Sequence, residues 1–309
     1  MNIIYNGTDI TSSVHPVAIQ ITDNAGGKPD SLSVVFSDSD GVWSKWRPAK
    51  NDTIQIRENG FDTGVMYVDQ LVQTAGRFGI MALSIPQESK TARSQGWENV
   101  RFLEFATQIA SRYGFTLRAY DVVNHLYNRV DQREEPDFTF LAYRCMLEGY
   151  ALKINNRTVV IYDEAKQEQK AVDPKRGFIR ESDVNGAFEF IDKSTDIYEK
   201  CVVRSLTPGG YIEGEFQAPG VRGPTLKRNE YATSQAEAIR WARGILRSLN
   251  KYMVTGMLTI NLNTNYAAGT VVAVQDIGMF DGKYIIDRLV HDLLNNRTKL
   301  WLRRPLEGY

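Results

Sequence analysis

The sequence predicts a mainly β protein in which two small antiparallel β-barrels flank an α+β module. Short apolar or alternating runs, separated by Gly, Asp and Asn, fill the first and last thirds of the chain. Apolar residues at helical spacing are concentrated in the middle third. A chain of 309 residues has room for two or three domains. We therefore assign an N-terminal barrel to residues 1–96, the α+β module to 97–172 and a C-terminal barrel to 173–309.

The first third contains three strand-like runs. They are residues 30–38 (DSLSVVFSD), 51–59 (NDTIQIREN) and 62–74 (DTGVMYVDQLVQT). Asn59-Gly60 is a dipeptide typical of a two-residue hairpin turn, and it lies between the second and third runs. Strands this short and this closely connected predict a small antiparallel sheet or barrel.

The middle third changes to a helical period. Residues 98–114 place one set of apolar side chains on a single face: Phe102, Phe105, Ala106, Ile109, Ala110 and Tyr113. Gly114 follows where a left-handed C-terminal cap belongs. Residues 115–120 then predict a strand, and 150–156 with 158–163 predict a hairpin that turns at Asn155 and Asn156.

Strand patterns return in the last third, at residues 199–206, 256–263, 269–276, 283–293 and 298–304. A long amphipathic helix at about 234–252 interrupts them and opens with a capping box, Ser234 and Glu237. Its apolar face comprises Ile239, Trp241, Ala242, Ile245, Leu246, Leu249, Tyr252 and Met253. The opposite face carries a basic stripe, which we define as Arg240, Arg243, Arg247 and Lys251.

The basic stripe has two interpretations. We expect the apolar face to pack on the C-terminal barrel, so that the stripe points outward. The stripe is then a candidate interface that meets acidic groups of a neighbouring subunit or partner. The alternative is an ordinary solvated helix face.

Composition excludes several classes of function. The 37 basic and 37 acidic side chains cancel, which argues against binding to nucleic acid through bulk charge. No apolar run approaches the roughly 20 residues of a membrane span, and the first residues predict no secretory signal. Cys145 and Cys201 lie far apart, as in proteins that fold in a reducing cytosol. The three histidines lack zinc-site spacing, so we predict no catalytic, cofactor-binding or metal-binding residue.

The stretch 131–156 (DQREEPDFTFLAYRCMLEGYALKINN) raises the question of catalysis, because it gathers several carboxylates. Pro136 fixes the entry backbone of a helix, and Asp137 follows at the position of an N-cap. Glu134 and Glu135 precede the helix, where its dipole favours negative charge. The capping interpretation needs no chemistry, whereas a catalytic pair needs a partner acid or histidine. We therefore assign Asp137 as a structural cap.

Asp62-Thr63-Gly64 matches the short signature of aspartic proteases, in which two aspartates share a proton across a dimer. The tripeptide occurs once and lies in a predicted hairpin. Short motifs of this kind occur by chance, so a structural role is favoured.

Several segments resemble the late control D type baseplate hub proteins of phage tails, tail-like bacteriocins and type VI secretion spikes. They are residues 109–117 (IASRYGFTL), 132–149 (QREEPDFTFLAYRCMLEG), 233–246 (TSQAEAIRWARGIL), 267–276 (AAGTVVAVQD) and 282–304 (GKYIIDRLVHDLLNNRTKLWLRR). Their order and spacing carry the resemblance, which covers roughly residues 99–304 and is weaker before them. It implies two barrels like those of the tail tube, so that a homotrimer presents six barrels in a ring.

The resemblance further implies a structural hub that adapts a sixfold tail tube to a threefold central spike. The implied partners are further copies of the chain, the tail tube protein, the spike, the tape measure protein and other baseplate proteins. The implied location is a virion or tail-like particle, made in the cytoplasm of a host bacterium. No spike needle or lysozyme domain follows residue 309, so we expect the spike to be a separate chain. The alternative function is a tail-associated cell-wall hydrolase or peptidase accessory, with Asp62 or Glu134 as its acid.

Overall fold

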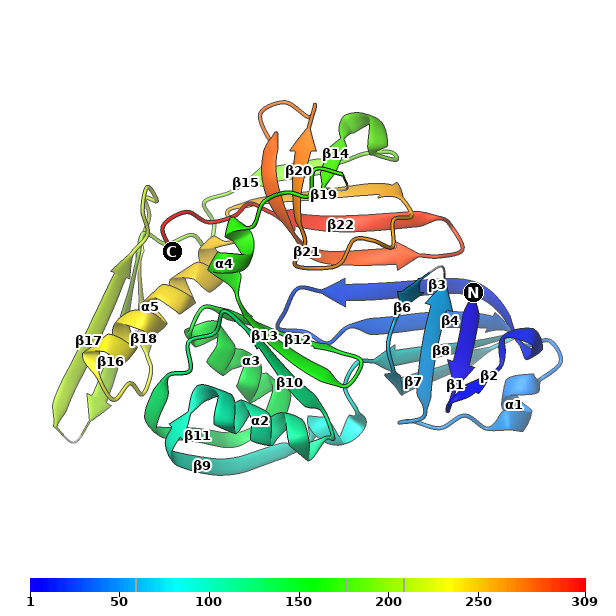
Figure 1. Cartoon of the computed structure of the whole chain (residues 1–309), viewed down its shortest axis with the longest axis horizontal. Helices are drawn as coiled ribbons and strands as arrows, with labels where there is room; N and C mark the ends of the chain where they lie inside the picture. The colour runs from blue at the N-terminus through cyan, green and yellow to red at the C-terminus, as the bar shows by residue number, and fades with distance from the viewer. Residues whose placement is uncertain (59, 176, 208) are drawn as a thin grey trace.

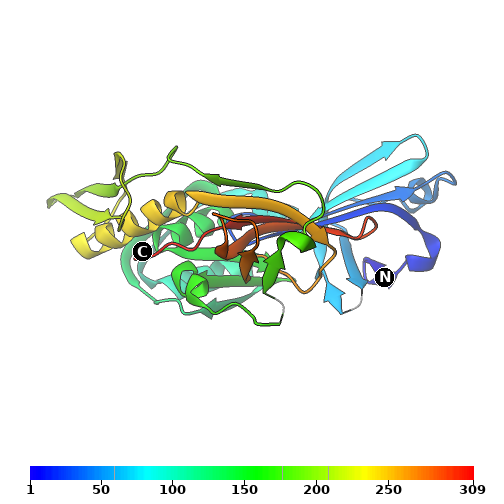
Figure 2. The same cartoon turned by 90° about the horizontal axis from the view of Figure 1, so that it is seen from above.

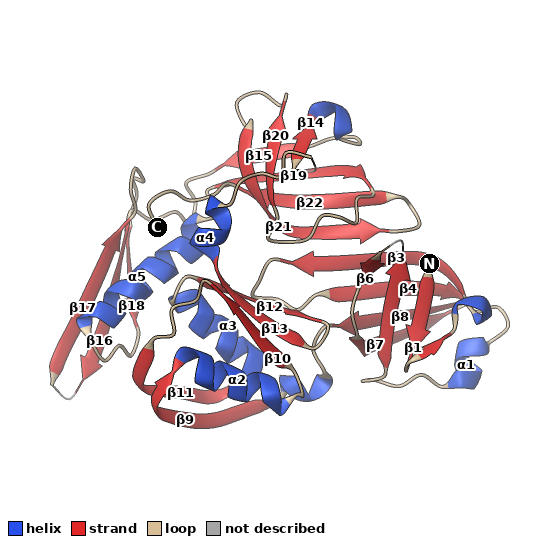
Figure 3. Ribbon diagram, in the orientation of Figure 1, coloured by secondary structure: helices blue, strands red, loops and turns tan. Residues whose placement is uncertain are grey.

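The computed structural model describes residues 1–58, 60–175, 177–207 and 209–309. Strands hold 47% of the chain and helices 19%, which confirms a mainly β protein. Most of the helices gather around one module, while strands fill the rest of the molecule (Figure 3). The expected turn at Asn59-Gly60 includes Asn59, which lies outside the described residues.

The N-terminal unit is built on antiparallel strands. They are β1 (Asn2–Tyr5), β2 (Thr8–Asp9), β3 (His15–Asn24), β4 (Ser31–Ser37), β5 (Thr53–Glu58), β6 (Phe61–Asp62), β7 (Met66–Thr74) and β8 (Arg77–Leu83), with helix α1 (Val42–Trp46) between β4 and β5. Alternation in β4 buries Leu32, Val34 and Phe36 on one face. Trp43 of α1 is buried against these strands and stacks on Phe78 with ring centroids 5.3 Å apart. The unit therefore has an aromatic core of its own.

The C-terminal unit has a separate core and comprises β14 (Phe178–Arg180), β15 (Glu189–Asp192), β19 (Val254–Asn261), β20 (Val271–Gln275), β21 (Gly282–Asp292) and β22 (Arg297–Arg303). Its strand β21 pairs antiparallel with β3, which lies directly beside it in Figure 1. The two units thereby share one 14-stranded sheet. Its main path runs β15-β19-β22-β21-β3-β4-β8-β7-β5-β1-β2, and β14, β20 and β6 pair off this path. Among the described residues no sheet closes into a barrel, because the strands at the two ends of the path, β15 and β2, do not pair with each other.

The α+β module lies between these units in the sequence. Its elements are β9 (Ala92–Arg101), α2 (Phe102–Arg112), β10 (Thr116–Tyr120), β11 (Leu126–Pro136), α3 (Asp137–Leu147), β12 (Tyr150–Asn155), β13 (Thr158–Asp163) and α4 (Glu164–Gln169). The predicted apolar face of α2 is buried, and Gly114 has a φ of 67° after the helix, as expected. The acidic run before α3 belongs to strand β11, which pairs with β9 and contains a bulge between Gln132 and Glu135.

Helix α5 (Gln235–Asn250) does not pack on the C-terminal sheet as expected. It covers a separate sheet of β16 (Lys200–Thr207), β17 (Gly210–Gln217) and β18 (Thr225–Asn229), and its other side meets α3. Figure 2 shows this helix and its sheet extending from one end of the molecule. Residues of β16 and α5 join the buried core of 97–161, so that core is not confined to the predicted module 97–172.

Candidate functional site

Asp62 is the first candidate acid, and it closes a turn. Its Oδ1 accepts hydrogen bonds from Gln55 at 2.6 Å and from the amide of Gly64 at 2.8 Å, and its Oδ2 accepts one from Arg57 at 3.0 Å. Partial burial opposes ionisation, but these three donors outweigh it and lower the pKa of Asp62. Both oxygens of this carboxylate are occupied by donors from Gln55, Arg57 and Gly64, so the geometry favours the structural role.

Glu134 is the second candidate acid. It is exposed and lies in the bulge of β11, where its φ is 49° and its amide donates to Ser94 Oγ at 3.2 Å. The neighbouring Glu135 has its pKa raised by burial. Glu134 therefore marks a bend in the strand.

Asp137 is not the N-cap of α3, so the prediction of a cap is wrong. The helix begins at Asp137 and its N-cap is Pro136, with no side-chain capping bond. The carboxylate is fully buried and turns away from the first-turn amides toward charged and polar partners. Its Oδ2 accepts from Arg112 at 2.7 Å and from the Tyr113 hydroxyl at 2.8 Å, and its Oδ1 accepts from Gln132 at 2.8 Å. Asp137 thus ties the end of α2 to the start of α3.

His291 and the two cysteines lie away from solvent. His291 is buried against Thr298, at 2.9 Å, and burial lowers its pKa. Both cysteines are buried, and burial raises the pKa of Cys201 to about 11 and that of Cys145 further. Within the described ranges, no group of three His, Cys, Asp or Glu side chains is arranged to hold a metal ion. No described helix combines the length and apolarity needed to cross a membrane.

The basic stripe is not an outward face, so the expectation that it points outward as a whole is wrong. Arg247 is 2% exposed, and Lys251 and Arg240 are also engaged inside the molecule. Only Arg243 is exposed, and its guanidinium lies 5.9 Å from the ring of Phe216. The stripe faces inward because α5 is covered on two sides, by the β16–β18 sheet and by α3 with α4.

Glu148 receives one arginine of the stripe and is a site that sequence reasoning missed. Its side chain is 1% exposed and accepts from Tyr127 at 2.8 Å, Trp241 Nε1 at 2.8 Å and Arg240 Nε at 3.0 Å. Burial alone would raise its pKa, but these donors, led by Arg240, lower it. Gly149 then leaves the helix with a φ of 77°. The Glu148-Gly149 end of α3 therefore locks α3 to α5.

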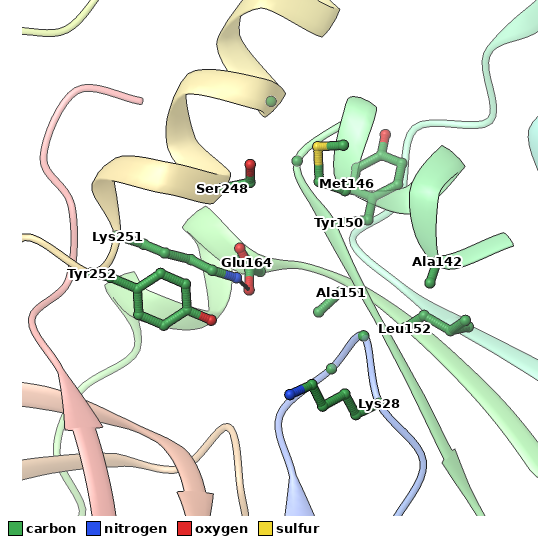
Figure 4. Close-up of a pocket in the computed structure, with 14 residues that line it drawn as sticks. Lys28, Ala142, Met146, Tyr150, Ala151, Leu152, Glu164, Ser248, Lys251 and Tyr252 are labelled. Carbon is green, nitrogen blue, oxygen red and sulfur yellow. Dashed lines mark hydrogen bonds and ion pairs between the residues drawn. The ribbon is translucent and has the colours of Figure 1, made fainter. Parts of the chain in front are cut away.

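A second buried network joins α4, α5 and β22. Arg247 Nη2 lies 2.5 Å from Glu168, Lys251 Nζ lies 2.8 Å from Glu164, and Arg303 contacts both glutamates. Burial opposes ionisation of Glu164, but the nearby cations prevail and lower its pKa to about 2. Figure 4 shows Lys251 reaching Glu164 beside a hollow of about 260 Å³. The charges are paired inside the protein, so they hold elements together.

A third ionic cluster docks the N-terminal unit on the module. Lys153 of β12 contacts Asp23 and lies 3.3 Å from Asp30, and both aspartates flank the β3–β4 turn. Burial raises the pKa of Asp30 to about 7 against the pull of Lys153. The amide of Gly27 in the same turn donates to the carbonyl of Leu152 at 3.0 Å. The three networks thus lie at junctions between elements, a placement suited to a rigid building block.

No known sequence family and no curated protein sequence matches the chain. Its fold is shared with solved structures. The 43 kDa tail protein of prophage MuSo2 from Shewanella oneidensis matches with a TM-score of 0.76 and 14% identity, over 98% of each chain. A tail protein from Neisseria meningitidis matches with a TM-score of 0.73 and 12% identity, over 98% of this chain and 95% of that one.

A component of the type VI secretion system of E. coli has the same fold. It is described as structurally similar to bacteriophage T4 tail proteins gp27 and gp5, and matches with a TM-score of 0.60 and 11% identity. The alignment covers 100% of this chain and 78% of that one. The chain has the fold of phage tail proteins. At the level of fold, the resemblance to tail hubs is confirmed.

Proposed function

We propose that this chain is a structural subunit of a phage tail or tail-like particle, and that it forms the baseplate hub. In this function three copies make a ring that adapts the sixfold tail tube to a threefold central spike. The partners are other copies, the tube protein and a separate spike chain, with the tape measure and further baseplate proteins as neighbours. The particle is assembled from protein made in the cytoplasm of a host bacterium.

The pairing of β3 with β21 is the observation that carries this proposal. It joins two β units, each with a core of its own, edge to edge within one chain. Three such chains would bring six β units into a ring, which matches the symmetry of a hexameric tube. The whole-length likeness to tail proteins supports the same function.

The alternative of a cell-wall hydrolase has no observation in its favour. Asp62 and Glu134 have the turn and bulge geometry described above. Turnover of cell wall that is lost in Asp62→Asn or Glu134→Gln would restore this alternative.

The proposal is tested by the mass of the purified protein and by negative-stain images. A hub subunit is expected to have the mass of three chains of 35.0 kDa, alone or on mixing with tube and spike proteins, and to form rings. Rings that cap tube ends would support the adaptor role. A protein that stays monomeric with both partners present, and leaves tube ends bare, would refute it.

A further inference from the structure

A second hollow, of about 280 Å³, opens beside α5. It lies between α5, the end of α3 and the loop that precedes β11. Three arginines of one helix face contribute to its wall: Arg240, Arg243 and Arg247. The remaining wall includes Val123, His125 and Tyr309, together with the carboxylates of Glu148 and Asp163.

Two of these arginines, Arg243 and Arg247, have N–H groups that no described residue accepts. Arg247 is 2% exposed, yet within the described structure its Nη1 has no hydrogen-bond partner. Buried guanidinium donors are rarely left unfilled. Arg243 is exposed at the mouth and makes no ion pair with any described residue. Arg240 bonds Glu148 through Nε at 3.0 Å.

The acidic residues of the wall are already engaged. Glu148 accepts from Tyr127, Trp241 and Arg240, and Asp163 Oδ1 accepts from the amide of Lys166 at the start of α4. His125 adds no fixed charge at neutral pH, because burial lowers its pKa. Asp163 makes no ion pair with any described residue, so its carboxylate and the guanidinium of Arg243 are the two charges of the wall without a counter-charge. The exposed one of the two is Arg243, at the mouth.

We propose that this hollow binds an oxyanion, either a carboxylate or a phosphate group, between Arg243 and Arg247. A guanidinium presents parallel N–H donors that match both groups. The volume is below the roughly 300–1,000 Å³ of sites that enclose whole drug-sized ligands. The ligand is therefore a single small acidic group, which could be a glutamate side chain of a protein or a free phosphate. This site does not depend on the hub function.

The test is calorimetric titration of the intact chain at constant ionic strength with inorganic phosphate, glutarate and chloride. Glutarate represents a carboxylate side chain, and chloride reports general ion effects. Saturable binding of phosphate or glutarate, but not chloride, is expected. A preference for phosphate assigns a free anion, and a preference for glutarate assigns a protein carboxylate.

Variants at the mouth test the location, and they are expected to leave the fold intact because Arg243 and Val123 are exposed. Arg243→Gln is expected to weaken binding at least tenfold, and Val123→Asp is expected to weaken it through repulsion. Arg297→Gln, an exposed arginine on β22, is the matched control and should bind like the parent protein. No saturable binding of either probe, or equal affinity in parent and Arg243→Gln, would overturn the proposal.

Discussion

Asp137 shows how one carboxylate can serve two helices. It is buried at the start of α3 and accepts hydrogen bonds from Arg112 and Tyr113 at the end of α2. The buried ion pair with Arg112 requires a negative charge at residue 137, which an amide or a hydroxyl group cannot supply. We expect Asp137→Asn and Asp137→Ser to lose about 1–3 kcal/mol of unfolding free energy, nearly as much as Asp137→Ala. Urea melts of the three variants check this, and full recovery in Asn or Ser would return Asp137 to a capping role.

Glu164 makes the unfolding free energy depend on pH in the acidic range. Its pKa is lowered from 4.5 to about 2 in the folded protein, through Lys251, Arg303 and Arg247 against the effect of burial. A lowered carboxyl pKa stabilises the folded state above the unfolded value and loses that contribution as pH falls. The unfolding free energy of the parent should therefore drop between about pH 4.5 and pH 2. Glu164→Gln should show a shallower drop over this window in denaturant melts, and parallel curves would contradict the assignment.

These residue-scale partners were not predictable from the sequence. The position of Asp137 at a helix start predicted a cap, since local amides were the only partners in view. Two of its real partners, Tyr113 and Arg112, lie 24 and 25 residues away, at the end of α2. Glu148 meets Arg240 and Trp241 across about ninety residues of sequence. The sequence does contain one signal for this contact. Glu148 stands at the predicted end of a helix, and Arg240 and Trp241 are adjacent donors that can bind its carboxylate.

At the scale of elements, α5 illustrates close packing that depends on glycine. A Cβ on Gly244 would lie 2.6 Å from the carbonyl oxygen of Met146 and closer still to that of Leu147. Helix propensity alone predicts that Gly244→Ala stabilises α5 by about 1 kcal/mol. Because the obstacle is backbone, we expect the opposite, a loss of about 1–3 kcal/mol from overpacking. Thermal melts show whether Gly244→Ala raises or lowers the melting temperature.

Gly79→Ala in β8 is the matched control for this test. A Cβ there meets nothing nearer than 3.5 Å, which is ordinary contact. Its melting temperature should stay near that of the parent. A Gly244→Ala variant more stable than Gly79→Ala would mean that α5 does not press on α3.

Periodicity predicted elements well where burial is one-sided. The apolar face of α2 and the alternation in β4 lead directly to the observed helix and strand. The surroundings of α5 were harder to predict from the sequence. A helix that is covered on two sides buries ion-paired side chains as well as apolar ones. The arginines that looked solvated in sequence are held by Glu148, Glu164 and Glu168. Strand pairing between β3 and β21 leaves no local signal at all.

At the scale of the whole molecule, the three units are expected to unfold together. Lys153 ties the β3–β4 turn to β12, and the shared sheet ties the same unit to β21. Lys153→Met should leave Asp23 and Asp30 without their cation and loosen the N-terminal unit. Hydrogen exchange is then expected to rise in β4 and β8 before it rises in α5, whereas in the parent all three respond together.

The exposed Lys227 of β18 supplies the control, as Lys227→Met removes a charge without touching this junction. Exchange that rises equally in all three elements of Lys153→Met would show that the shared sheet alone couples the units. Unchanged exchange would show that Lys153 carries no part of the coupling.

The pairing of β3 with β21 has a consequence for synthesis on the ribosome. Gln20 and Asp292, hydrogen-bonded neighbours across this pair, are 272 residues apart in the chain. The N-terminal unit can acquire its core early, but one edge of β3 waits for almost the entire polypeptide to emerge. During that interval the nascent chain displays an open strand edge, which other nascent chains can pair with. Chaperone binding to the nascent chain should therefore persist until β21 leaves the exit tunnel.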